Sequence, residues 1–161
     1  MSFPGGMQDQ EDGGDHVKTA LRETQEEIGV ESCQIKVYGV GTCFSTQDRR
    51  GLIYPVVASV DLDFTGDPFH LNREEVHDVH LIPLKDLCNF SCWRYTRWKR
   101  PGSDNSIALP VYRDIVLNDC NTPRLWGITA LITHFVLMAV LPTEYRFQFD
   151  LFAPVVAKDV V

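Results

Sequence analysis

The sequence predicts an α/β fold in which helices pack on the faces of a mixed sheet. Three observations point to this class: an amphipathic helix near the start, several later stretches with the alternation or apolar content of strands, and a long apolar helix after them. Strands and helices mixed in this way are typical of layers that share one core. A chain of 161 residues is long enough for one such core. We therefore expect a single domain over residues 1–161, with the tail from about residue 146 unassigned.

The first helix is predicted over residues 15–28. Asp15 is a suitable N-cap and Gly29 a suitable left-handed stop. Four residues recur at helical spacing and would face the core: Val17, Leu21, Thr24 and Ile28.

Four later stretches predict strands, at residues 35–43, 52–62, 74–84 and 107–116. The second is expected to be long and buried, with Pro55 near an edge or bulge. Turns and loops are expected at 46–51, 64–72, 101–106 and 117–123, and a short helix at 85–90. The apolar stretch 124–141 predicts a core helix rather than a membrane span, because its apolar part is at the short limit for spanning and contains polar side chains.

The net charge of −7 argues against a general nucleic-acid-binding surface, so we expect no nucleic acid partner. We also expect no membrane partner, because the most apolar stretch is at the short limit for a span. An odd count of five cysteines without regular spacing predicts free thiols in a reducing compartment and disfavours a zinc site. The chain opens abruptly on a glycine turn and carries no targeting segment, so we expect the first strands of the sheet to be missing.

One helix turn concentrates three carboxylates. Glu23, Glu26 and Glu27 stand at i, i+3 and i+4 and so share a face. Such a trio is either a solvated acidic surface or a site for a hard divalent cation such as Mg²⁺ or Mn²⁺. The neighbouring Arg22 can fix one carboxylate and leave the others free for metal, and glycine at position 6 permits a close approach of the backbone.

This stretch resembles the Nudix hydrolase box, G-x5-E-x7-R-E-x-x-E-E-x-G. Its second half matches at Arg22, Glu23, Glu26, Glu27 and Gly29. The first half departs from the pattern, because the sixth residue after Gly6 is Asp12 rather than Glu. Nine residues rather than seven then separate Asp12 from Arg22. We therefore interpret Asp12 as part of a loop.

Further stretches resemble the coenzyme A diphosphatase branch of this family, and the similarity is greatest to the mitochondrial-type member of that branch. They are Phe3-Pro4-Gly5-Gly6, Asn72-Arg73-Glu74-Glu75-Val76 and Trp126-Gly127-Ile128-Thr129-Ala130. The resemblance implies a Nudix α/β/α sandwich. It also implies hydrolysis of the pyrophosphate of coenzyme A or an acyl-CoA to adenosine 3′,5′-bisphosphate and (acyl-)4′-phosphopantetheine. A mitochondrial location is implied too, with cytoplasmic or peroxisomal as alternatives.

The same resemblance implies roles for individual residues. Metal ligands would be Glu23, Glu26 and Glu27, together with a carbonyl of Gly5 or Gly6. Arg22 would orient Glu23 or Glu26, Glu23 could help activate water, and Glu75 would be a base or metal ligand. Substrate contacts would come from Phe3, Gly5 and Gly6. We expect a monomer or homodimer.

Three alternatives stay open at this point. The enzyme could act on another nucleoside diphosphate derivative such as ADP-ribose, or the chain could be an inactive fragment or a non-enzymatic binding module. The basic and aromatic stretch 93–100 could contact coenzyme A phosphates, stack on RNA bases, or form a solvated hairpin with its tryptophans packed inward. His134 is interpreted as a satisfied core histidine.

Overall fold

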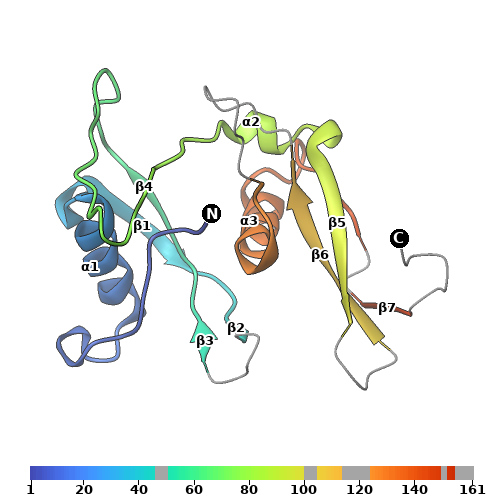
Figure 1. Cartoon of the computed structure of the whole chain (residues 1–161), viewed down its shortest axis with the longest axis horizontal. Helices are drawn as coiled ribbons and strands as arrows, with labels where there is room; N and C mark the ends of the chain where they lie inside the picture. The colour runs from blue at the N-terminus through green and yellow to red at the C-terminus, as the bar shows by residue number, and fades with distance from the viewer. Residues whose placement is uncertain (46–50, 100–104, 114–123, 150–151, 155–161) are drawn as a thin grey trace. The chain divides into compact units, whose positions relative to one another are not determined.

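The computed structural model describes residues 1–45, 51–99, 105–113, 124–149 and 152–154 (Figure 1). The chain divides into two compact units, residues 3–80 and residues 81–161 with residues 1–2, and each is described by itself. Helices and strands are present in both, which confirms the α/β class. The single-domain expectation stays a prediction.

The unit of residues 3–80 contains the predicted acidic helix, α1 (His16–Ile28). The Asp15 side chain caps its first turn by accepting a hydrogen bond from the backbone N–H of Val17 at 2.9 Å. Gly29 ends it with φ 73°, a conformation that glycine adopts without strain, and its N–H donates to the Gln25 carbonyl. The predicted helix and both of its termini are confirmed.

Beside α1 lies an antiparallel ribbon of β1 (Ile35–Val40) and β4 (Val56–Val60), and α1 contacts both strands. A shorter pair joins β2 (Phe44–Ser45) to β3 (Leu52–Ile53). The expectation of one long buried strand over 52–62 is wrong. The strand is interrupted at Tyr54-Pro55, since proline has no N–H for the ladder, and β4 is half-buried to exposed.

The strand predicted over residues 74–84 is also wrong. A turn at residues 73–75 takes its place, because the Asn72 carbonyl accepts from the N–H groups of Glu75 and Val76. The Asn72 N–H donates to the Glu27 carbonyl at 2.9 Å, and the His70 N–H donates to the Ile28 carbonyl at 3.0 Å. The chain at residues 70–72, just before this turn, therefore satisfies two carbonyls at the end of α1.

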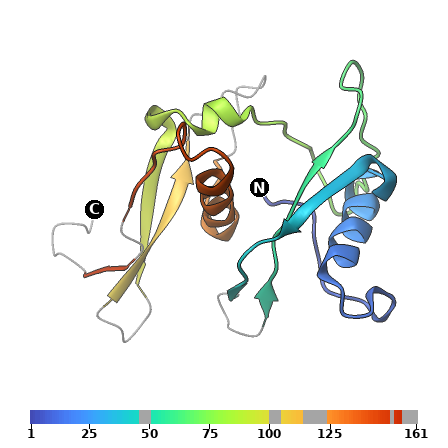
Figure 2. The same cartoon turned by 180° about the vertical axis from the view of Figure 1, so that it is seen from behind.

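The second unit begins with α2 (Leu84–Leu87) and a 3₁₀ turn at Phe90–Cys92 (Figure 2). Its antiparallel sheet has the order β5-β6-β7, with β5 at Trp93–Lys99, β6 at Asn105–Tyr112 and β7 at Phe152–Pro154. The helix α3 (Gly127–Val140) packs on β6. The strand β7 lies in the tail for which the sequence supported no assignment. The turns expected at 46–51 and 101–106, and the loop at 117–123, lie largely or wholly outside the described residues.

The core of this unit is aromatic and carries a buried polar chain. The Tyr145 hydroxyl contacts the Tyr112 hydroxyl and lies 2.7 Å from Nδ1 of His134, which confirms His134 as a satisfied core histidine. Trp93 stacks on Phe147 with ring centroids 5.0 Å apart, so the first tryptophan of the basic stretch packs inward. Within the described ranges, no helix has the length and apolarity required to cross a bilayer.

Candidate active site

The guanidinium of Arg22 is the centre of the site on α1. Its Nε and Nη2 donate to the two carboxylate oxygens of Asp12 at 3.2 and 3.0 Å. Nη2 also donates to the Met7 carbonyl at 3.0 Å. Nη1 donates to Oε1 of Glu23 at 2.9 Å and to Oε2 of Glu26 at 3.0 Å. One side chain therefore fixes two of the three carboxylates and ties them to the loop before the helix.

Asp12 is the site residue that sequence reasoning missed. It lies in a 3₁₀ turn (Gln10–Asp12), is only 4% exposed, and also accepts from the Thr19 hydroxyl and the Asp9 N–H. The hydrogen bonds from Arg22, and then that from Asp9, hold the pKa of this carboxyl well below its usual value. The interpretation of Asp12 as plain loop is therefore wrong.

The signal for Asp12 was its position six residues after Gly6, which coincides with the first glutamate of the box. The extra residues before Arg22 obscured it. Gly13 and Gly14 both adopt left-handed conformations, with φ 62° and 83°. These two glycines reverse the chain between Asp12 and the helix, so the carboxylate reaches Arg22 despite the longer spacing.

The glycine segment, which we define as residues 5–8, approaches the carboxylates closely. The Gly5 N–H donates to Oε1 of Glu27 at 3.1 Å. A Cβ atom on Gly6 would lie 2.4 Å from Oε1 of Glu23, far inside van der Waals contact. The predicted close approach is thus present, although the described contact is made by an N–H. The carbonyl ligand from Gly5 or Gly6 stays a prediction.

The three carboxylates suit a hard divalent cation in donor type. Each uses one oxygen in a hydrogen bond to Arg22 or Gly5, and its second oxygen has no hydrogen bond among the described residues. Among all the residues that the structure describes, no group of three or more His, Cys, Asp or Glu side chains is gathered closely enough to hold a metal ion. The oxygen donors of the three carboxylates therefore suit a hard cation. Their side chains would have to turn toward one another to coordinate it together.

Two other predicted site residues lie at the surface. Glu75 is exposed in the turn that Asn72 ties to the Glu27 carbonyl, so its backbone is anchored to the end of α1. Phe3 is 55% exposed. The structure brings Arg22, Glu23, Glu26 and Glu27 together with Gly5 and Gly6. Among the described residues, the Glu75 side chain makes no hydrogen bond to this group.

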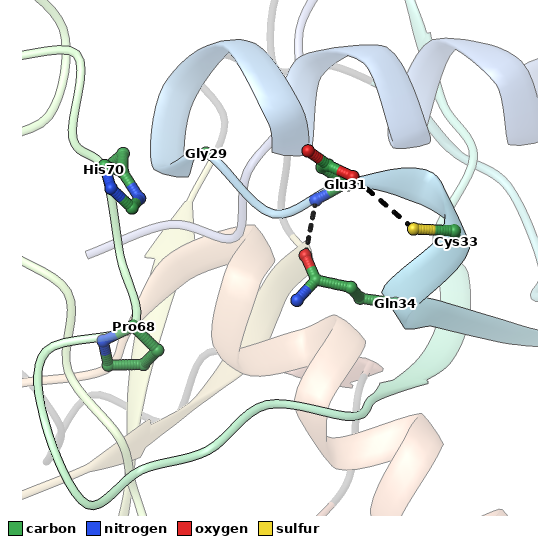
Figure 3. Close-up of a pocket in the computed structure, with 6 residues that line it drawn as sticks. All are labelled: Gly29, Glu31, Cys33, Gln34, Pro68 and His70. Carbon is green, nitrogen blue, oxygen red and sulfur yellow. Dashed lines mark hydrogen bonds between the residues drawn. The ribbon is translucent and has the colours of Figure 1, made fainter.

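An open pocket of about 620 Å³ lies beyond the C-terminal end of α1 (Figure 3). Its lining comprises Gly29, Glu31, Cys33, Gln34, Pro68 and His70. The Gln34 side chain accepts from the Glu31 N–H at 3.0 Å, and the Cys33 thiol donates to the Glu31 carboxylate at 3.5 Å. None of the predicted site residues lines this pocket.

Fold and site together define a class of protein: an α/β protein with an arginine-ordered acidic helix face beside a glycine segment. The chain belongs to the Nudix family, because residues 1–104 match the NUDIX domain.

Three curated relatives extend this finding. Human mitochondrial coenzyme A diphosphatase NUDT8 (Homo sapiens) is 36% identical over 149 residues, which cover 91% of this chain and 58% of the relative. Peroxisomal coenzyme A diphosphatase NUDT7 of Mus musculus is 40% identical over 152 residues, 93% of this chain and 61% of the relative. Nudix hydrolase 3 of Caenorhabditis elegans is 27% identical over 152 residues, 91% of this chain and 62% of the relative. The resemblance to the coenzyme A diphosphatase branch is thus confirmed, and the chain spans about three fifths of the length of these relatives.

Proposed function

We propose that this chain is a metal-dependent pyrophosphohydrolase that acts on coenzyme A or acyl-CoA. The products would be adenosine 3′,5′-bisphosphate and (acyl-)4′-phosphopantetheine. The observation that carries the proposal is the network of Arg22, which orders Glu23 and Glu26 on one helix face. The substrate is supported by the similarity to proteins named coenzyme A diphosphatases.

Glu23, Glu26 and Glu27 would hold the cation, Mg²⁺ or Mn²⁺. A divalent cation at such a site supplies Lewis-acid stabilisation of phosphate oxygens and lowers the pKa of water. Arg22 binds one oxygen each of Glu23 and Glu26 and presents the other, so both side chains are oriented before any ligand arrives. The three carboxylates would still have to turn toward one another to share a cation, because no such group is gathered among the described residues.

The loop elements have separate tasks in this proposal. Glycine at position 6 lets the backbone lie against Glu23, and Phe3, Gly5 and Gly6 would contact the substrate. Glu75 would accept a proton from the attacking water or add a ligand to the cation, since its backbone is anchored beside the end of α1. Mitochondrial and peroxisomal locations are both proposals that follow the names of the relatives, and a monomer or homodimer stays a prediction.

The substrate is tested by incubating the purified chain with Mn²⁺ and, in parallel, coenzyme A, ADP-ribose, NADH and a dinucleoside polyphosphate. Release of adenosine 3′,5′-bisphosphate from coenzyme A supports the proposal. Consumption of ADP-ribose with coenzyme A left intact would assign another Nudix substrate, and a chain inactive on the whole panel would favour a fragment or binding module.

The role of the carboxylates is tested with Glu26→Gln, which keeps the shape of the side chain and removes its charge. We expect activity to fall by more than about tenfold, because a metal ligand contributes several kcal/mol to the transition state. Glu11→Gln is the matched control, since Glu11 is exposed and outside the cluster. Activity of Glu26→Gln within tenfold of that control would remove Glu26 from the ligand set.

A further inference from the structure

We propose that the stacked rings of His16 and Tyr54 hold the glycine segment against the acidic face of α1, which makes His16 a positioning residue. The inference rests on the proposed function for its catalytic consequence. Its structural part, the anchoring of residues 5–8, can be measured without any substrate.

His16 lies on the same face of α1 as the carboxylates. Glu23 lies seven positions after it and Glu27 eleven positions after it. At about 100° per residue these spacings return to within about 20° of the starting direction. The rise of about 1.5 Å per residue places Glu23 roughly 10 Å and Glu27 roughly 16 Å further along the helix. His16 is therefore the N-terminal end of the stripe that bears the proposed metal ligands.

The chain before α1 runs beside the helix in the opposite direction, as the dark blue segment shows in both views (Figures 1 and 2). From Gly5 to Gln8, the glycine segment contacts residues of α1 that lie progressively nearer the N-terminus of the helix. They are Gly5 with Glu27, Gly6 with Glu23, Met7 with Arg22, and Gln8 with His16. The segment is thus attached at both ends, and the residues that touch the carboxylates lie between Gly5 and Gln8.

The attachment of the glycine segment at its Gln8 end depends on a ring stack. The rings of His16 and Tyr54 lie 3.7 Å apart between centroids and are inclined by 9°. Tyr54 stands in the interruption between β3 and β4, so the stack also joins that point of the chain to the start of α1. The contact from Gln8 Nε2 to Nδ1 of His16 is long, at 3.5 Å, and is weak by itself. The stack on Tyr54 therefore fixes the position of the imidazole. The fixed Nδ1 in turn restricts where the Gln8 side chain can lie.

The consequence reaches the carboxylates because the fit there is tight. Glu23 lies close enough to Gly6 that a single added carbon would overlap it. A shift of the segment by about 1 Å would change the space available to Glu23 and lengthen the hydrogen bond from Gly5 to Glu27. Changes in groups that support metal ligands typically reduce metal affinity or activity by 10–100-fold.

The test compares His16→Ala with Lys18→Ala, an exposed residue of the same helix outside the stripe contacts. Three quantities are measured: hydrogen exchange of the Gly5 amide by NMR, the Kd for Mn²⁺ by electron paramagnetic resonance, and kcat and KM for coenzyme A. For His16→Ala we expect roughly tenfold faster Gly5 exchange and a Kd for Mn²⁺ raised at least about tenfold. Lys18→Ala should match the wild type.

Two further variants separate stacking from folding. Tyr54→Phe retains a ring on the intact imidazole and is expected to keep both quantities within about threefold of the wild type, whereas His16→Gln retains a polar atom without a ring and should resemble His16→Ala. If Gly5 exchange and Mn²⁺ affinity in His16→Ala and His16→Gln equal those of Lys18→Ala, the positioning role is refuted. A wild type that hydrolyses no coenzyme A refutes the proposed function only, because the exchange and Mn²⁺ measurements still decide the anchoring.

Discussion

Adding one carbon to Gly6 is the sharpest perturbation of this site. The Cβ of Gly6→Ala would lie 2.4 Å from Oε1, 2.6 Å from Cδ and 2.7 Å from Oε2 of Glu23. Ordinary contacts of a Cβ begin near 3.4 Å, so the carboxylate has to withdraw by about 1 Å. The backbone of Gly6 needs no left-handed conformation, so the substitution acts through this overlap alone.

The expected effect falls on chemistry rather than on stability. The atoms in the way are the end of a flexible side chain, which can move at little energetic cost to the fold. However, moving them disturbs the 2.9 Å hydrogen bond from Arg22 to Oε1 of Glu23. A misplacement of about 1 Å in a catalytic group can reduce the rate about 100-fold. That factor corresponds to about 2.7 kcal/mol of lost transition-state stabilisation.

The assay measures kcat with coenzyme A and Mn²⁺ together with the melting temperature. Gly39→Ala is the matched control, because Gly39 lies on β1 with no atom within 4 Å of an added Cβ. We expect Gly6→Ala to lose about 100-fold in kcat while melting within a few degrees of Gly39→Ala. A Gly6→Ala enzyme with kcat within twofold of the control would refute the inferred coupling between Gly6 and Glu23.

Two predictions concern stability. Gly29→Ala should destabilise the protein by about 1–2 kcal/mol in urea unfolding, because alanine is strained at φ 73° and its Cβ would meet the Cβ of His70 at 2.6 Å; an unchanged midpoint would contradict this. Burial lowers the pKa of His134 below its ordinary value of 6.5, so at more acidic pH the unfolded chain binds the proton that the folded chain excludes, and stability should fall as pH decreases below about 6.5. Unfolding at pH 7.5 and 5.5 (roughly one unit either side of that value) should show a smaller loss in His134→Gln, and equal losses would remove His134 as a cause.

The role of Arg22 explains why an incomplete match to the family pattern still yields an ordered site. Its donors are divided between Asp12 on one side and Glu23 and Glu26 on the other. The pairing with Asp12, followed by that with Glu23, raises the pKa of Arg22, so the guanidinium stays charged under all ordinary conditions. Four carboxylates, including Asp9 at 3.8 Å, are thereby held around one guanidinium, and the cluster keeps a net negative charge that favours a cation.

Local sequence determined the helix and its acidic face. Asp15 and Gly29 specify where α1 begins and ends, and a fixed helical period then places Glu23, Glu26 and Glu27 together. These features depend on residues within a few turns of one another, so periodicity and capping suffice to predict them. The specific second half of the box also sufficed to predict the family.

Only the tertiary structure decided which distant groups meet that face. The reach of Asp12 to Arg22 depends on two consecutive left-handed glycines, and spacing alone misled because it does not reveal a reversal of the chain. The stack of His16 on Tyr54 joins residues 38 positions apart, and no periodic pattern links them. Likewise, the stretch after Asn72 has the alternation of a strand but turns, because the N–H groups of Glu75 and Val76 donate back to the Asn72 carbonyl instead of to a ladder. Long-range partners of this kind are selected by packing and hydrogen-bond satisfaction, which a local pattern does not encode.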